Sequence, residues 1–159
     1  MYNSNIHQQA IAKIQGSKLY PTISGEVYFR DIPTGVMIFA TISGLPAFKP
    51  SINNEDPIGP HGFHIHNIGT CEDSNSSNAF LSAGEHFNPN NQPHGNHAGD
   101  LPVLFSNDGI AIMSFFTNKF TVKDIIGKSV IIHQNPDDYR SQPSGKSGTR
   151  IACGIIYSL

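Results

Sequence analysis

The sequence lacks several features that would assign it to a common class of protein. It contains no Trp, only two Cys in 159 residues, and a charged fraction of only 14%. So low a charge argues against a coiled coil, and the chain has no low-complexity tract of the kind that stays disordered. Ten Lys and Arg against twelve Asp and Glu leave no basic excess, which argues against nucleic-acid binding. No apolar run approaches the ~20 residues of a membrane span.

The N-terminal residues also lack the features of an export signal. Met1 to Ile14 has neither the basic start nor the continuous apolar stretch of a signal peptide. We therefore expect an intracellular protein, in the cytoplasm or, for a viral protein, in the host cytoplasm or virion. The alternative is an exported protein from which the leader has been removed. The abundance of Ile and Asn indicates an AT-rich genome, such as that of a bacterium or a large DNA virus.

Turn residues and short alternating runs are what the sequence does contain. Its 15 Gly and 11 Pro are scattered without a period, as in β proteins with many turns. About eight short β-type runs lie between them, and Asn107-Asp108-Gly109 is a strong hairpin signal between two of these. We expect one all-β domain over residues 1–159, an antiparallel sandwich or barrel, with Met1 to Gln8 as a loose extension. The expected strands are residues 11–14, 22–30, 36–42, 62–66, 103–105, 110–116, 130–133 and 151–157.

Three long irregular stretches connect these strands. Residues 46–60 are polar and rich in Pro, residues 67–99 carry most of the His, and residues 134–149 are rich in Asp, Ser, Gly and Pro. Irregular loops of this length within a compact domain are usually functional or disordered. We therefore look for the functional residues in these loops and at the strand ends beside them.

The histidines are concentrated in one part of the chain, with six of the eight between His61 and His97. Residues i and i+2 of a strand point to the same face, so His64 and His66 would present two imidazoles side by side. That pair alone also fits two exposed or hydrogen-bonded histidines. The residues that follow favour metal binding, because three imidazoles and a carboxylate form a plausible zinc site, whereas nitrogen-only ligation suits Cu(II). These further candidates are His86, His94, His97, Asp100 and His133.

Four motifs together resemble Cu/Zn superoxide dismutase. They occur in the order of that family, and the resemblance extends from Gln9 to Tyr157. It implies an eight-stranded antiparallel Greek-key barrel with long metal-binding and electrostatic loops. The motifs are HGFHIH at 61–66, GEHFNP at 84–89, HAGDL at 97–101 and GTRIACG at 148–154.

The resemblance implies one copper and one zinc ion per chain, with His86 as a bridging ligand of both. The implied copper ligands are His64, His66, His86 and His133. The implied zinc ligands are His86, His94, His97 and Asp100. The gap from His94 to His97 is only two residues, far shorter than in most members of the family. We therefore expect the loop that carries the zinc ligands, residues 86–100 (the zinc loop), to be unusually tight.

Further side chains receive roles from the same resemblance. Asp137 would hydrogen-bond one copper ligand and one zinc ligand, namely His64 and His94, and so fix their rings. His61 would brace the fold without binding a metal. Cys71 and Cys153 would form a disulfide within the chain.

The substrate channel is also implied by the resemblance. Arg150 would position a small anion beside the copper, because a guanidinium is always charged and offers several donors. The alternative for Arg150 is a surface ion pair. Ser144 would lie at the lip of the channel. Lys146 would either steer anions or be an ordinary solvated lysine.

The implied activity is the conversion of superoxide to dioxygen and hydrogen peroxide, a function in antioxidant defence. The expected partners are superoxide, a second copy of the chain in a homodimer, and a copper chaperone, with neither nucleic acid nor membrane. One alternative is a dismutase-like metal-binding module without activity. The other is a purely structural β domain that holds zinc.

Overall fold

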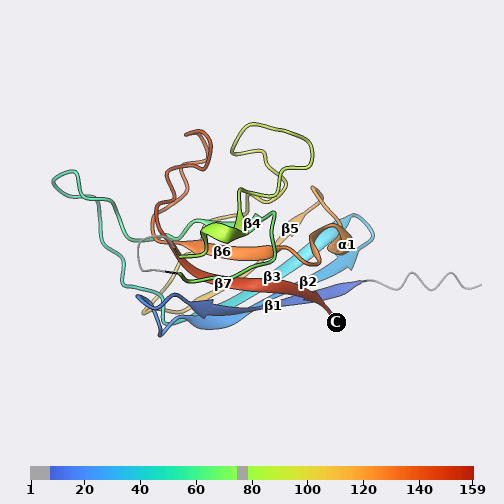
Figure 1. The fold of residues 1–159 in the computed structure, drawn as a ribbon, viewed down its shortest axis with the longest axis horizontal. Coiled ribbons are helices and arrows are strands. Elements are labelled where there is room, and N and C mark those ends of the chain that lie inside the picture. Colours follow the sequence, from blue (N-terminus) through green and yellow to red (C-terminus); the bar gives the residue numbers. More distant parts are fainter. Residues whose placement is uncertain (1–7, 75–78) are drawn as a thin grey trace, which may run out of the picture.

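The computed structural model describes residues 8–74 and 79–159. Apart from Gln8, the expected N-terminal extension lies outside the described residues. Seven strands of the described chain form one antiparallel sheet in the order β4-β6-β7-β1-β2-β3-β5, which curls into a half-barrel (Figure 1). The all-β antiparallel fold expected from the sequence is confirmed. The strands are β1 (Gln9–Gly16), β2 (Ser24–Ile32), β3 (Gly35–Ser43), β4 (Phe63–His66), β5 (Ala111–Thr117), β6 (Ser129–His133) and β7 (Arg150–Ser158).

Alternating side chains on the strands build the core on the concave side of the sheet. On β1, for example, Ala10, Ala12 and Ile14 are buried, while the residues between them are partly or fully exposed. This period of two is the expected pattern for a sheet with one face in water. In contrast, every residue of β4 and β6 is buried, because loops cover the outer side of these strands. The histidines of both strands, which the sequence predicts as metal ligands, therefore lie in a water-poor region.

One expected strand is wrong: residues 103–105 do not form a strand. Leu104 makes only an isolated bridge to His61, through two backbone hydrogen bonds of 2.8 and 2.9 Å. The preceding Pro102 has no N–H to donate, and the N–H of Val103 donates to the Tyr139 hydroxyl at 2.8 Å. The predicted hairpin turn at Asn107 is present, since this residue bridges Ile110 across the two turn residues.

Two short helices complete the described structure. The single-turn α1 (Val122–Ile125) buries Val122 and Ile125, and the 3₁₀ helix η1 (Leu81–Ala83) lies in the loop after β4. No helix of the described residues is long and apolar enough to cross a membrane.

The connections to and from β4 and β6 carry the candidate site. β4 and β5 lie at opposite edges of the sheet, so the chain crosses from one edge region to the other before β4, between β4 and β5, and again after β5. The loop after η1 and the loop after β6 project from the same side of the sheet (Figure 1). These are two of the three irregular stretches that the sequence indicated.

Candidate metal centre

The free edge of β4 is the line along which the metal-ligating residues assemble. β4 is the last strand of the sheet, so only one of its sides pairs with β6. On the other side, isolated antiparallel bridges join His66 to His86 and His64 to Asp100. The loop after β4 thus folds back along the strand and places His86 and Asp100 opposite the two histidines.

Four buried histidines form the first donor set, which the sequence predicted as the copper site. Each offers one ring nitrogen, and these atoms all lie within 4.8 Å of one another. An irregularity in the pairing of β6 with β7 falls between Ile132 and His133, and such a bulge redirects a side chain. The four members of the set are His64, His66, His86 and His133.

One nitrogen of each histidine in this set is buried without a hydrogen-bond partner. These atoms are Nδ1 of His64 and Nε2 of His66, His86 and His133. The other nitrogen of His66 donates to the Gly84 carbonyl at 2.8 Å, and that of His133 donates to the Gly148 carbonyl at 3.1 Å. Because a carbonyl only accepts, the proton sits on Nδ1 of both rings and leaves Nε2 with a free lone pair. Buried polar atoms are normally paired, so this cluster of lone pairs fits a metal ion.

His86, His94, His97 and Asp100 form the second donor set, predicted as the zinc site. Nδ1 of His86 lies 2.8 Å from Asp100 Oδ1, Nδ1 of His97 lies 3.2 Å from the same oxygen, and Nδ1 of His94 lies 3.3 Å from Oδ2. Three imidazoles and one carboxylate are a usual tetrahedral zinc set. The residues present therefore fit both metals.

The short zinc loop is compatible with this set because its tight turn uses the carboxylate. Asp100 Oδ2 accepts hydrogen bonds from the backbone N–H of Gly95 at 2.8 Å and of His97 at 3.0 Å. These bonds orient the Asp100 side chain between the three rings. The close spacing of His94, His97 and Asp100 is thus part of how the site is built.

His86 belongs to both sets and lies between them. Its Nδ1 contacts Asp100 in the second set, while its unpartnered Nε2 belongs to the first. Its ring stacks on that of His64 with 4.0 Å between centroids. A single imidazole therefore connects the two sites through its two nitrogens.

Asp137 makes a second connection between the two sets. Its Oδ2 accepts from Nε2 of His64 at 2.6 Å and its Oδ1 from Nε2 of His94 at 2.8 Å. The side chain is fully buried, and a Cβ at position 145 would lie 1.8 Å from Oδ1, so only Gly145 leaves room for this contact. The carboxylate thereby fixes the orientation and tautomer of one ring in each set.

Burial keeps His64, His66 and His133 of the first set neutral. Desolvation, followed by the neighbouring imidazoles, holds the pKa of His64 and of His66 well below the usual value. Desolvation also lowers the pKa of His133 to about 3. A metal ion binds a neutral imidazole, so these residues are in the binding form at neutral pH.

Arg150 lines a cavity that reaches the first set, since His86 and His133 also line it. It begins β7 and pairs with His133 across the sheet. Its Nη1 donates to the Phe80 carbonyl at 2.7 Å and its Nη2 to the Gly84 carbonyl at 2.8 Å, so the guanidinium is held and half-buried. The cavity of about 520 Å³ is lined by Ala79, Leu81, Glu85, His86, His133, Pro143, Ser144, Gly148, Thr149 and Arg150.

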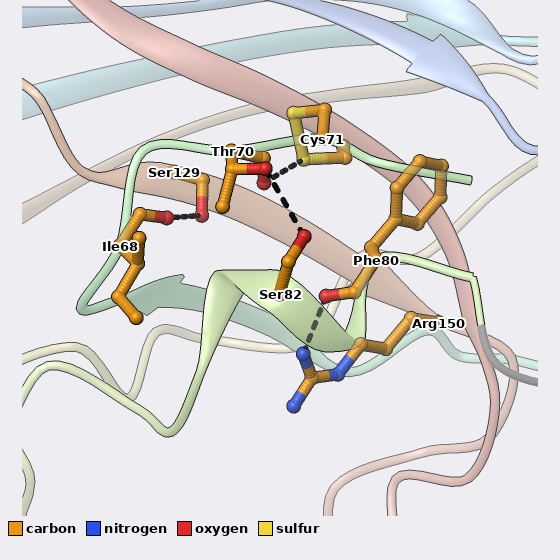
Figure 2. The surroundings of a disulfide bond; sticks show 8 residues. Ile68, Thr70, Cys71, Phe80, Ser82, Ser129 and Arg150 are labelled. Atoms are coloured by element: carbon orange, nitrogen blue, oxygen red, sulfur yellow. Dashed lines mark hydrogen bonds between the residues drawn. A yellow bond between two sulfur atoms is a disulfide. The ribbon is translucent and has the colours of Figure 1, made fainter. Parts of the chain in front are cut away.

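The predicted disulfide between Cys71 and Cys153 is confirmed, with 5.6 Å between the Cα atoms. Figure 2 shows how it ties the loop after β4 to β7, close to the segment whose carbonyl at Phe80 holds Arg150. Thr70 and Ser82 add a hydrogen bond of 3.0 Å between their hydroxyls within this loop. The disulfide and Arg150 are thus attached to the same loop.

The remaining predicted residues lie near the site without belonging to either set. His61 donates from Nδ1 to the carbonyls of His133 and Gln134, at 3.0 and 3.1 Å. Ser144 lines the cavity, whereas Lys146 is exposed in the same loop and does not line it. Sequence reasoning missed Phe80, because its contact with Arg150 uses a backbone carbonyl, for which a sequence has no signal.

Comparisons with known proteins agree with this geometry. The model of the copper/zinc superoxide dismutase family matches residues 23–156. The superoxide dismutase [Cu-Zn] of Legionella pneumophila is 35% identical over 144 residues, which cover 86% of this chain and 79% of the relative. That of Deinococcus radiodurans is 31% identical over 154 residues, with the same coverage. That of Photobacterium leiognathi is 36% identical over 122 residues, covering 69% and 70%. With both donor sets intact, this chain belongs to the Cu/Zn superoxide dismutase family.

Proposed function

We propose that this protein converts superoxide to dioxygen and hydrogen peroxide as an active dismutase in antioxidant defence. The observation that carries the proposal is the pair of buried donor sets that share His86, with four unpartnered nitrogens in the first. Copper held by that set supplies one-electron redox chemistry, and zinc in the second set orients the shared imidazole. The chain's own contribution is a set of rings whose tautomers are fixed before metal binds.

His86 is the residue that would deliver a proton to the product. Its Nδ1 faces the second set, so Nε2 is the atom at which it can hold a proton on the side of the cavity. His86 also lines the cavity that Arg150 borders. A proton on this nitrogen is therefore within reach of an anion bound there.

Arg150 would bind and orient the superoxide anion. Two carbonyls fix its guanidinium, and the nitrogen–hydrogen groups not used for these bonds remain for an anion. Ser144 offers a hydroxyl on the same cavity.

Lys146, exposed nearby, would steer anions, so Lys146→Ser should weaken the fall of the rate with ionic strength.

The test is metal content and dismutase activity on protein prepared with both metals supplied. We expect one copper and one zinc per chain, and we expect Arg150→Ala to lower activity by at least tenfold without changing metal content. Zinc without copper, and no activity after copper is added back, would instead support the inactive metal-binding module. Unchanged activity in Arg150→Ala would refute the role of that residue.

We further propose a homodimer and a copper chaperone as partners, as the family resemblance implies. The outer face of β3 and β5 supports the dimer, because it exposes Ile112 (74%), Phe116 and Phe39. The burial of all four copper-ligating histidines supports assisted loading. Light scattering should give twice the chain mass, and loading from free Cu(I) should be slower than loading from a chaperone. A monomeric mass at micromolar concentration would contradict the dimer.

A further inference from the structure

The zinc-ligating residue His94 is held by a loop that lies far away in the sequence. The segment 137–142 follows β6, yet it contacts His94 at three separate atoms. Nε2 of the ring bonds to Asp137, and both backbone polar groups bond to the side chain of Gln142. The short zinc loop therefore obtains part of its support from a distant segment of the chain.

Gln142 pairs with the backbone of His94 through both ends of its carboxamide. The His94 N–H donates to Gln142 Oε1 at 2.8 Å, and Gln142 Nε2 donates to the His94 carbonyl at 3.3 Å. The same Nε2 also donates to the carbonyl of Arg140 at 3.2 Å, within its own loop. The two hydrogen bonds to the N–H and carbonyl of His94 are of the kind that a neighbouring β-strand makes to one residue. His94, in a loop with no such neighbour, is fixed as it would be in a sheet.

The two loops lie in direct contact next to this pairing. A Cβ at Gly95 would lie 2.3 Å from the carbonyl oxygen of Tyr139, so a side chain at this position would push the loops apart. Tyr139 also accepts the N–H of Val103 and donates to the carbonyl of Leu101, at 2.8 and 3.0 Å. The 137–142 segment thus contacts the chain both before and after the Asp100 turn.

We infer that Gln142 is a positioning residue of the zinc site, which holds the backbone of His94 so that Nδ1 faces Asp100. With His94 N–H, carbonyl and Nε2 all bound, the ring has little freedom left, and Nδ1 stays 3.3 Å from Asp100 Oδ2. The inference rests on the zinc site of the proposed function, but not on superoxide turnover.

The test is zinc affinity in copper-free protein, measured by chelator competition. Gln142→Met keeps the length of the side chain and removes both hydrogen bonds to His94, together with the one to Arg140. Loss of a group that orients a metal ligand typically lowers affinity 10- to 100-fold, and we expect about tenfold here because the ring contact to Asp137 remains. Cobalt(II) bound in place of zinc should also show an altered visible absorption spectrum in this variant, since that spectrum reports ligand geometry.

Gln92→Met is the matched control. The Gln92 carboxamide bonds only within the zinc loop, to Asn90 and Asn96 at 3.2 and 3.0 Å. We expect wild-type zinc affinity and cobalt spectrum in this control. Equal affinity in Gln142→Met and wild type, or an equal loss in both variants, would overturn the inference. The inference would also be overturned if the loss of zinc-binding free energy were matched by an equal loss in the free energy of unfolding of the metal-free protein. Because the assay contains neither copper nor superoxide, its failure would leave the proposed activity untouched.

Discussion

Asp137 shows how much of this site depends on a single side chain that binds no metal. One carboxylate accepts from two rings, at 2.6 and 2.8 Å, in a fully buried position. An amide of the same shape has only one acceptor oxygen, so it can satisfy only one of the two ring N–H groups.

We therefore predict that Asp137→Asn lowers the affinity for both metals by 10- to 100-fold. The adjacent Asp138→Asn is the control, because Asp138 is exposed and bonds to Arg140 and Ser141 rather than to either ring. Metal titration of both variants would check this. Equal affinities in the two variants would remove Asp137 from the site.

The exposed Asp138 gives a prediction about pH. The Ser141 hydroxyl, followed by the backbone N–H groups of Ser141 and Arg140, lowers the pKa of Asp138 to about 2 from the ordinary 3.8. A carboxylate with a lowered pKa stabilises the fold above its unfolded pKa, and this contribution is lost as the pH falls from 3.8 towards 2. We expect Ser141→Ala to raise the Asp138 pKa, as measured by carbon NMR of the carboxyl group. The same midpoint in both proteins would contradict the assignment.

At this scale the sequence, read with the family resemblance, was sufficient for the ligands and for Asp137, but not for the backbone contacts that hold the loops. His64 and His66 stand out because two histidines separated by one residue share a face of a strand. The Gln142 side chain contacts the backbone of His94, and Phe80 and Gly84 hold Arg150 through backbone carbonyls, which every residue has. No residue type identifies such a contact before the loops are placed.

At the scale of elements, the strands with alternating side chains were predictable and the irregular pairings were not. Residues 103–105 look like a strand by composition, yet Pro102 and the contact to Tyr139 leave only the single bridge at Leu104. The irregularity before His133 depends on how β6 pairs with β7 and has no local signal. Pairing partners, rather than propensity, decided both cases.

The one-turn helix α1 gives a prediction for an element too short to be stable alone. The backbone N–H and the hydroxyl of Thr121 both donate to Asp124 at 2.7 Å, and Asp31 accepts from the Val122 N–H at 2.9 Å. We expect Thr121→Ala to lower the free energy of unfolding by about 1 kcal/mol. It should also raise the pKa of Asp124, which the Thr121 hydroxyl lowers. Chemical denaturation would check the stability, and Thr117→Ala, outside the helix, is the control.

At the scale of the whole molecule, the disulfide joins parts of the chain separated by 82 positions. Closing so long a loop restricts the unfolded chain, which stabilises the folded state in the chain-entropy account. We predict that the double variant Cys71→Ser, Cys153→Ser loses about 2–4 kcal/mol of unfolding free energy in metal-free protein. Denaturation of the variant beside oxidised and reduced wild type would measure this. Equal stability of the three proteins would show that the bond has no such effect.

The fold class followed from turn residues and short runs, because an all-β chain repeats these signals along its length. The closure of the metal centre did not follow from them, since it needs the loop after β4 to return along the free edge of that strand. The resemblance to the family supplied what local physical reasoning lacked, namely which distant histidines meet.

His86 and Asp137 each contact both donor sets, and this sharing has a thermodynamic consequence. A metal ion that shifts the His86 ring or the Asp137 carboxylate in one set thereby shifts ligands of the other set, so we expect occupancy of one site to change the affinity of the other. Binding free energies are reciprocal: the factor by which zinc raises copper affinity equals the factor by which copper raises zinc affinity. We therefore expect the affinity of each site to depend on the occupancy of the other.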